Sequence, residues 1–220
     1  MKDIKVIRKL VSKEMCGFLY NYFRLKRKTA KLMFEYGVIS SLEKDFGVFG
    51  DGQAPSKDTF CLYGDSAFET LLTKIKPRLE KHLQQKLIET YAYARIYTKG
   101  DDLKTHIDRK NCDHSITLNV GGARWPFYIE DENHDTIEVV LKPGDAIIYR
   151  GDKYRHWRDK LEGEECAQVF LHYITEGENH PHSSPFDFRP SLGLSLTQAK
   201  YMKDAMQRIK ENENNYKRIK

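Results

Sequence analysis

Hydrophobic residues in the first third of the chain recur at the spacing of amphipathic helices. Ser12 is a suitable N-cap for a first helix that ends near Leu25, and a second amphipathic segment covers residues 29–38. After a glycine-rich loop, Asp65 starts a further helix that continues past Pro77 with a kink or a restart. We expect these helices to pack on one face of the structure that follows.

From Glu89 onward the hydrophobic period changes to two. Residues 90–97 alternate and are rich in aromatic side chains, which is typical of a strand. Further strand candidates follow at short, regular spacing and are separated by turns rich in Gly, Pro and Asp: residues 115–120, 125–129, 136–141, 146–149 and 167–173. Short strands in this rhythm favour an antiparallel sandwich or a jelly roll.

The C-terminal part differs from both. Residues 181–190 have the composition of a loop, and Ser195 begins another amphipathic segment. A chain of 220 residues is long enough for one domain with a substantial core. We therefore expect a single domain, with helical support in residues 1–88, a β-rich core in 89–175, and a loop and helix in 176–220.

Composition narrows the class of protein. No run of residues is apolar for long enough to span a bilayer, and the N-terminus lacks the apolar core of a signal peptide. We therefore expect a soluble, cytoplasmic protein without a membrane partner.

The four cysteines are scattered without CxxC spacing: Cys16, Cys61, Cys112 and Cys166. This pattern predicts free thiols rather than disulfides or a zinc site.

Charge is segregated along the chain. The formal net charge is +5, but basic residues concentrate in 1–31 and 196–220, so the middle of the chain is acidic. Basic ends are able to attract nucleic acid or another polyanion through its phosphates. Solvated helix faces and a frayed tail account for the same residues, and the sequence leaves both interpretations open.

One triplet suggests a metal site. His106 and Asp108 are separated by one residue, and residues i and i+2 of a strand point to the same face. His156 follows in the chain, and a jelly roll brings late strands beside early ones. Two imidazoles and one carboxylate form the facial triad that holds non-haem iron(II) and leaves coordination positions open. We expect these three side chains to share one ion.

Residues 90–175 resemble the catalytic core of the iron(II)- and 2-oxoglutarate-dependent dioxygenases, in their prolyl-4-hydroxylase-like branch. The matching stretches are Tyr93-Ala-Arg-Ile-Tyr97, the Gly100 turn, His106-Ile-Asp108, Ser115–Val120, Lys142-Pro-Gly-Asp145, His156 and Phe170-Leu-His-Tyr173. The resemblance implies an α+β fold with a double-stranded β-helix (jelly-roll) core, N-terminal supporting helices and a C-terminal helix.

The same resemblance implies a function. His106, Asp108 and His156 would be the catalytic iron ligands. Fe(II), the co-substrate 2-oxoglutarate and O2 would be required, and ascorbate is among the expected cofactors. The reaction would hydroxylate a prolyl or other peptide side chain while 2-oxoglutarate is decarboxylated to succinate. Halogenating relatives keep the position of Asp108 small so that chloride can bind, so a carboxylate here favours hydroxylation.

The chain departs from the family at the co-substrate anchor. Relatives in this branch hold the distal carboxylate of 2-oxoglutarate with Arg or Lys at the position that Cys166 occupies here. Arg158 and Gln168 are two substitutes, because each lies two residues past His156 or Cys166 on a strand. We favour Arg158, since a guanidinium binds a carboxylate through two hydrogen bonds. Tyr97 matches a tyrosine that contacts the same carboxylate in relatives.

Two further functions remain open at this point. One is a nucleic-acid oxidative demethylase or hydroxylase of the same superfamily, which only the basic ends suggest. The other is a non-catalytic metal-binding jelly roll. The reason to consider it is that Cys166 stands where relatives have the basic co-substrate anchor. His172, on the face of Cys166 and Gln168, either lines the cavity or packs in the core. The expected partner is a peptide, a protein or a small-molecule substrate, and the oligomeric state is left open.

Overall fold

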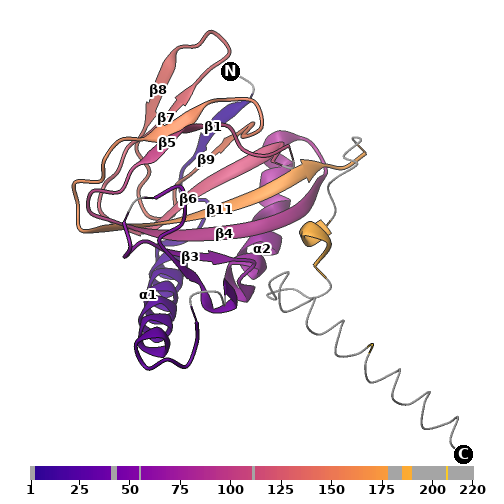
Figure 1. Ribbon diagram of the computed structural model, residues 1–220. Coiled ribbons are helices and arrows are strands. Elements are labelled where there is room, and N and C mark those ends of the chain that lie inside the picture. The colour runs from indigo at the N-terminus through magenta and orange to yellow at the C-terminus, as the bar shows by residue number, and fades with distance from the viewer. Residues whose placement is uncertain are drawn as a thin grey trace, which may run out of the picture.

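Two antiparallel sheets and two helices make up the fold in the computed structural model, which describes residues 3–40, 44–54, 56–110, 112–177, 185–189 and 207 (Figure 1). The large sheet has the strand order β1-β9-β6-β11-β4-β3-β2, and the small sheet has the order β5-β10-β7-β8. The strands are β1 (Ile4–Ile7), β2 (Val48–Phe49), β3 (Phe60–Tyr63), β4 (Leu87–Thr98), β5 (Leu103–His106), β6 (His114–Gly122), β7 (Phe127–Glu130), β8 (Thr136–Val139), β9 (Ala146–Tyr149), β10 (His156–Arg158) and β11 (Glu165–Thr175).

The helices are α1 (Lys13–Glu35) and α2 (Ser66–Leu83), and short 3-10 turns cover Lys44–Phe46 and Pro185–Phe188. Ser12 caps α1 by accepting a hydrogen bond from the Met15 amide at 3.2 Å, as predicted. The two helical segments predicted in the first third are one continuous helix, because the lysines and arginines between them are good helix formers. Asp65 caps α2, which continues through Pro77.

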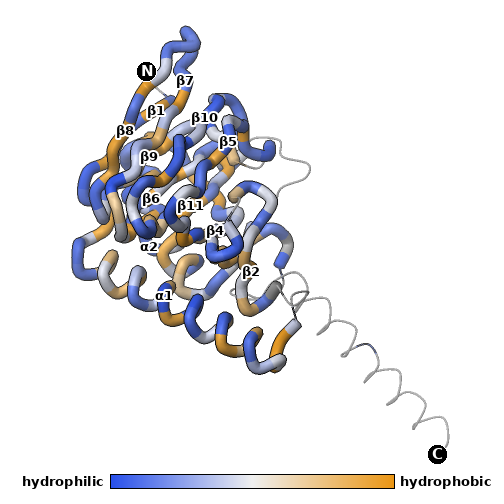
Figure 2. Tube along the Cα trace, turned by 60° about the vertical axis from the view of Figure 1, so that its left-hand side comes forward, coloured by the Kyte–Doolittle hydropathy of each residue, from blue (hydrophilic) through white to orange (hydrophobic). Residues whose placement is uncertain are grey.

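Both helices lie on one side of the large sheet, and the small sheet lies on the other (Figure 1). Hydrophobic and hydrophilic residues alternate along α1, as the colours of Figure 2 show. Phe23 of α1 and Phe68 of α2 are fully buried in one cluster with Leu118 of β6. Burying each large side chain contributes about 1.5–3 kcal/mol. The prediction that the helices pack on one face is confirmed.

A second apolar cluster joins the two sheets. Phe127 and Ile129 of β7 pack against Ile147 and Tyr149 of β9. Positions on the long strands β4, β6 and β11 alternate between the helix side and the interior between the sheets. Many of the positions that face this interior carry polar residues. The interior between the sheets therefore holds buried polar groups that hydrophobic packing alone does not explain.

Several elements were not anticipated. The segment predicted as helical support also contributes β1, β2 and β3 to the large sheet. These strands are too short for their periodicity to stand out, and pairing defines them: β1 pairs with β9, β3 with β4, and β2 with β3. His156, predicted to precede the last strand, lies in a short strand of its own, β10. The helix predicted from Ser195 lies outside the described residues.

Two compositional predictions can be compared with the structure. All four cysteines are buried free thiols. Neither of the helices in the described part of the chain is both long and apolar enough to cross a bilayer.

Candidate metal centre

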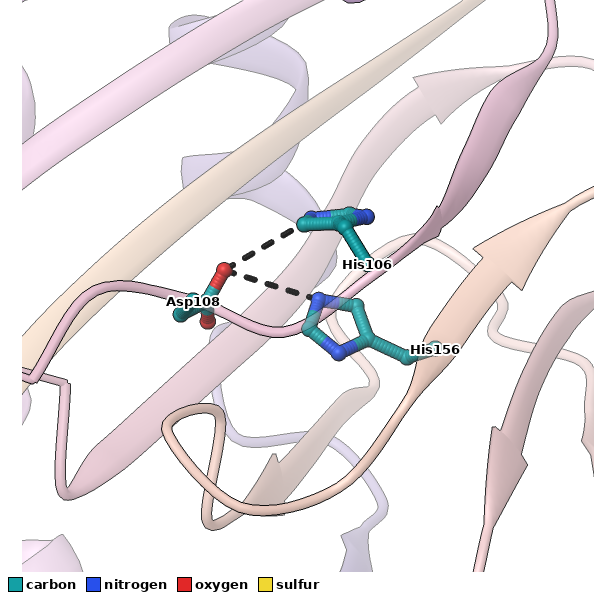
Figure 3. Close-up of side chains that lie close together, drawn as sticks. All are labelled: His106, Asp108 and His156. Carbon is teal, nitrogen blue, oxygen red and sulfur yellow. Dashed lines mark ion pairs between the residues drawn. The ribbon is translucent and has the colours of Figure 1, made fainter.

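His106, Asp108 and His156 converge at the interior between the sheets, with both imidazoles facing the carboxylate (Figure 3). The Nε2 atoms of His106 and His156 lie 3.6 and 3.5 Å from Oδ1 of Asp108. An ion about 2.1 Å from each donor would separate neighbouring donors by about 3 Å, which is close to this spacing. The side chains predicted to share an ion are therefore brought together.

The small sheet positions the two histidines. His106 ends β5 and His156 starts β10, and the two residues are direct cross-strand partners. His156 is buried, whereas the His106 side chain is 25% exposed, so the group is reachable from one side. The sequence predicted that Asp108 lies on the same strand as His106. This prediction is wrong, because β5 ends at His106. A hydrogen bond of 2.7 Å from the Asp108 amide to the Gly151 carbonyl fixes it instead.

Backbone carbonyl groups set the orientation of both rings. Nδ1 of His106 lies 2.7 Å from the Lys104 carbonyl, and Nδ1 of His156 lies 3.0 Å from the Tyr154 carbonyl. A carbonyl oxygen only accepts, so each Nδ1 carries a proton in these contacts. In the neutral ring, Nε2 then keeps a free lone pair aimed at the shared space. This is the arrangement in which metal-binding histidines are usually held.

Electrostatics agree with a cationic occupant. Burial acts to raise the pKa of Asp108, but the neighbouring imidazole rings of His106 and His156 hold that pKa well below its usual range. Burial acts to lower the pKa of His106, but contacts with Asp108 and with the Lys104 carbonyl together raise it above its usual value. The carboxylate is therefore ionised near neutral pH and favours positive charge between it and the rings.

A second polar cluster lies deeper in the interior. Arg158 shares the inner face of β10 with His156, and the ring of Phe127 packs against both. The Arg158 guanidinium donates to the Trp125 carbonyl at 2.7 Å and to Gln168 Oε1 at 3.2 Å. The Gln168 amide in turn donates to Cys166 Sγ at 3.0 Å.

Arg158 is a buried cation with no counter-ion among the described residues. Of the buried arginines that the structure describes, Arg95 pairs with Asp51 and Arg189 pairs with Glu69. No acidic side chain in the described part of the chain lies within ion-pair distance of Arg158, and its Nε has no hydrogen-bond partner there. Burial lowers the pKa of this guanidinium. An uncompensated buried charge is costly, which points to an anionic ligand.

The remaining predicted anchor, Tyr97, is completely buried beside Trp125 and Cys166. Its hydroxyl accepts a hydrogen bond of 2.9 Å from Arg95, which the sequence had left without a role. Arg95 also bonds to Gln53 and Tyr93 and thereby ties Tyr97 to the loop at residues 51–54. The alternation of residues 91, 93, 95 and 97 was the available signal that Arg95 faces inward.

A second group of possible ligands shares Asp108 with the first. Asp108, Cys112 and His172 offer atoms that also lie within 4.8 Å of one another. Burial raises the pKa of the Cys112 thiol to about 12 and lowers the pKa of His172 to about 4. A thiol must lose its proton to bind a metal, so this group is the poorer metal site. His172 is buried and stacks on Tyr91, so packing is shown, and the alternative that it lines a cavity stays a prediction.

No protein-family model matches the sequence, and no characterised protein matches it at the level of sequence. Solved structures do match. A prolyl-4-hydroxylase from Pseudomonas putida superposes with a TM-score of 0.55 at 10% identity, covering 80% of this chain and 94% of that chain. HygX from Streptomyces hygroscopicus, solved with nickel and 2-oxoglutarate bound, has a TM-score of 0.56 at 12% identity, covering 80% and 84%.

A third match is the non-haem alpha-ketoglutarate-dependent epimerase SnoN from nogalamycin biosynthesis. Its TM-score is 0.56 at 11% identity, and the match covers 89% of this chain and 91% of that chain. At such low identities the likeness shows a shared fold of antiparallel sheets with supporting helices. It supports the resemblance inferred from residues 90–175 at the level of the fold.

Proposed function

We propose that this chain is a non-haem iron(II)- and 2-oxoglutarate-dependent dioxygenase built on a double-stranded β-helix core. The observation that carries the proposal is the orientation of the donors. Two histidines, each fixed through Nδ1 by a backbone carbonyl, turn Nε2 toward one oxygen of Asp108. Two imidazoles and one carboxylate are the donor set of non-haem iron(II) oxygenases.

The residues present fit such an ion. His106, Asp108 and His156 would hold it on one side and leave the opposite side for other ligands. The metal, when bound, supplies the oxidative chemistry. This chain contributes the ligands, their fixed orientation and an apolar wall, in which Phe127 and Tyr149 pack against the His156 ring.

Arg158 would anchor the co-substrate. It lies on the same strand and face as His156, it is fully buried, and it has no acidic partner among the described residues. A dicarboxylate that reaches from the metal into the interior would supply the missing negative charge through bidentate hydrogen bonds. Gln168 is better described as a neutral support, because its Oε1 already accepts from Arg158. Tyr97 would line the same end of the pocket.

We propose a prolyl or other peptide side chain as the substrate, with hydroxylation as the reaction and succinate as the co-product. The resemblance of residues 90–175 to the prolyl-4-hydroxylase-like branch supports this choice. The carboxylate at Asp108 supports hydroxylation over halogenation. Structures with the same fold include one named as an epimerase, so the reaction on the substrate has to be assayed directly.

The experiment separates the components of the proposal. The protein is prepared anaerobically and loaded with Fe(II), and 2-oxoglutarate binding and succinate formation are measured with proline-containing peptides, free proline and oligonucleotides. Asp108→Ala tests the metal site, and Arg158→Gln tests the anchor with Gln168→Leu as its matched control. We expect Arg158→Gln to raise the 2-oxoglutarate concentration for half-maximal turnover by more than Gln168→Leu does.

Each negative result has a defined meaning. If iron-loaded protein does not bind 2-oxoglutarate, the proposed oxygenase activity is wrong and a non-catalytic metal-binding role replaces it. If only oligonucleotides stimulate succinate formation, the enzyme class stands and the peptide substrate is wrong. Equal effects of the Arg158 and Gln168 substitutions would remove Arg158 as the preferred anchor.

A further inference from the structure

The two oxygens of Asp108 have different surroundings. Oδ1 faces both histidine Nε2 atoms, and Oδ2 accepts a hydrogen bond of 2.6 Å from Ser115 Oγ. Ser115 lies on the inner face of β6 and is 1% exposed. The histidines belong to the small sheet, whereas Ser115 belongs to the large sheet. Asp108 therefore connects the large sheet to the two histidines.

Ser115 has a second partner on the large sheet. Its Oγ lies 3.1 Å from Nδ1 of His172, and the two residues are cross-strand partners in β6 and β11. The serine hydroxyl has one proton, and the shorter bond to an ionised carboxylate takes it. The serine oxygen must then accept from His172, so Nδ1 of His172 carries a proton. The bonds run in one direction, from His172 to Ser115 to Asp108.

Neighbouring groups hold this chain of bonds in place. The His172 ring stacks on Tyr91 of β4, with ring centroids 4.3 Å apart and planes at 25°. Gly151 lies next to the bond between Ser115 and Asp108, because a Cβ added there would collide with both Asp108 Oδ2 and Ser115 Oγ. Both the stack and the glycine restrict Ser115 and Asp108 to one arrangement.

We infer that Ser115 and His172 are positioning residues that hold Asp108 as a ligand through one oxygen, Oδ1. The inference rests on the proposed function. A carboxylate that swings freely can also bind through both oxygens, which occupies an additional coordination position. Fixing Oδ2 on Ser115 prevents this and keeps a position open for the co-substrate. His172 acts on the position of Asp108 through Ser115, which holds the one hydrogen bond to Oδ2 that involves this pair.

The test measures Co2+ binding to the full-length protein by calorimetry and by the visible absorption of the bound ion. Ser115→Ala removes the hydrogen bond to Asp108. His172→Leu removes the donor to Ser115, whereas His172→Asn places an amide N–H near the position of Nδ1. Thr90→Val is the control, because Thr90 is a fully buried threonine of β4 whose hydroxyl has no partner among the described residues.

We expect Ser115→Ala to weaken Co2+ binding about 10- to 100-fold and to change the absorption spectrum as the coordination changes. His172→Leu should weaken binding in the same direction, and His172→Asn should restore it toward the unmodified protein. The double variant Ser115→Ala/His172→Leu should bind no more weakly than Ser115→Ala, because His172 acts through Ser115. Thr90→Val should bind like the unmodified protein.

Other outcomes separate this inference from the proposed function. If Asp108→Ala binds Co2+ as tightly as the unmodified protein, the metal site itself is wrong. If Asp108→Ala abolishes binding while Ser115→Ala binds normally, the site stands and the positioning role is overturned. Additive losses in the double variant would also overturn it. If His172→Leu does not fold, the other two variants still test the inference. It requires weaker Co2+ binding by Ser115→Ala and near-normal Co2+ binding by His172→Asn.

Discussion

His106 and His156 are direct cross-strand partners, and their ring centroids lie 4.3 Å apart. Nothing local in the sequence joins them, because they belong to separate strands of the small sheet. Antiparallel pairing places both on the inner face, and a backbone carbonyl two residues before each one fixes its Nδ1. The register of β5 and β10 therefore determines whether the two imidazoles converge on Asp108.

Replacing either histidine of this pair should strongly weaken metal binding. We expect His156→Ala to weaken Ni2+ binding by at least about 100-fold, since it removes one of three protein ligands. Calorimetric titration measures this directly. His134→Ala is the matched control because that side chain is 87% exposed in the turn between β7 and β8. Equal binding by the two variants would contradict the assignment.

Arg158→Met should separate stability from function. A buried guanidinium without an acidic partner costs free energy, so the variant's free energy of unfolding should be unchanged or about 1 kcal/mol higher. Binding of 2-oxoglutarate to the metal-loaded protein should weaken about 10- to 100-fold, because a charge-assisted hydrogen bond is lost. Urea unfolding and calorimetry measure the two effects. A large loss of stability with normal binding would make Arg158 a structural residue.

Gln168→Glu should weaken binding of 2-oxoglutarate, although the two side chains have nearly the same size. The new carboxylate would lie beside Arg158, since Gln168 Oε1 already accepts from it at 3.2 Å. An internal ion pair would then compete with 2-oxoglutarate, and its dissociation constant should rise. Gln168→Met, which is neutral, should have the smaller effect. Tighter binding in Gln168→Glu would show that Arg158 does not meet the ligand.

Gly151→Ala should damage the metal centre although residue 151 binds no metal. The added methyl group would collide with Asp108 Oδ2 and Ser115 Oγ, so the carboxylate has to move. We expect at least about 10-fold weaker Co2+ binding. Gly17→Ala in α1 is the control, because a Cβ at Gly17 meets nothing within 4 Å and the substitution should stabilise the helix by about 0.5–1 kcal/mol.

Stability should fall with acidification because of His114. Burial, with the nearby Arg150, lowers the pKa of His114 in the folded protein to about 4, against 6.5 for an unperturbed histidine. The unfolded chain therefore binds more protons between these pH values, and the free energy of unfolding decreases as the pH falls from 7 to 4.

The contribution of His114 can be isolated with His114→Gln, which keeps a polar group near Thr175. The variant should lose on the order of 3 kcal/mol less stability between pH 7 and pH 4 than the unmodified protein. Urea unfolding at a series of pH values measures the difference. Parallel pH profiles for the two proteins would assign the acid sensitivity to other groups.

The sequence by itself determined those features that depend on neighbouring residues. Helical spacing and the caps at Ser12 and Asp65 defined the helices, and alternation defined the long strands. Helices and strands are read from adjacent residues, since backbone geometry fixes the periods of two and 3.6. The residue types at 106, 108 and 156 predicted a metal site, because two imidazoles and one carboxylate are the donor set of non-haem iron, but they did not show that the three side chains meet.

Only the tertiary structure decided the features that depend on partners far along the chain. Asp108 reaches the histidines through a hydrogen bond to Gly151, not through the alternation of a strand. That Arg158 has no acidic partner within the described part of the chain is visible only once the surrounding strands are in place. Ser115 and His172 meet because β6 and β11 pair in one register. Pairing of this kind is set by long-range packing, which a local pattern does not contain.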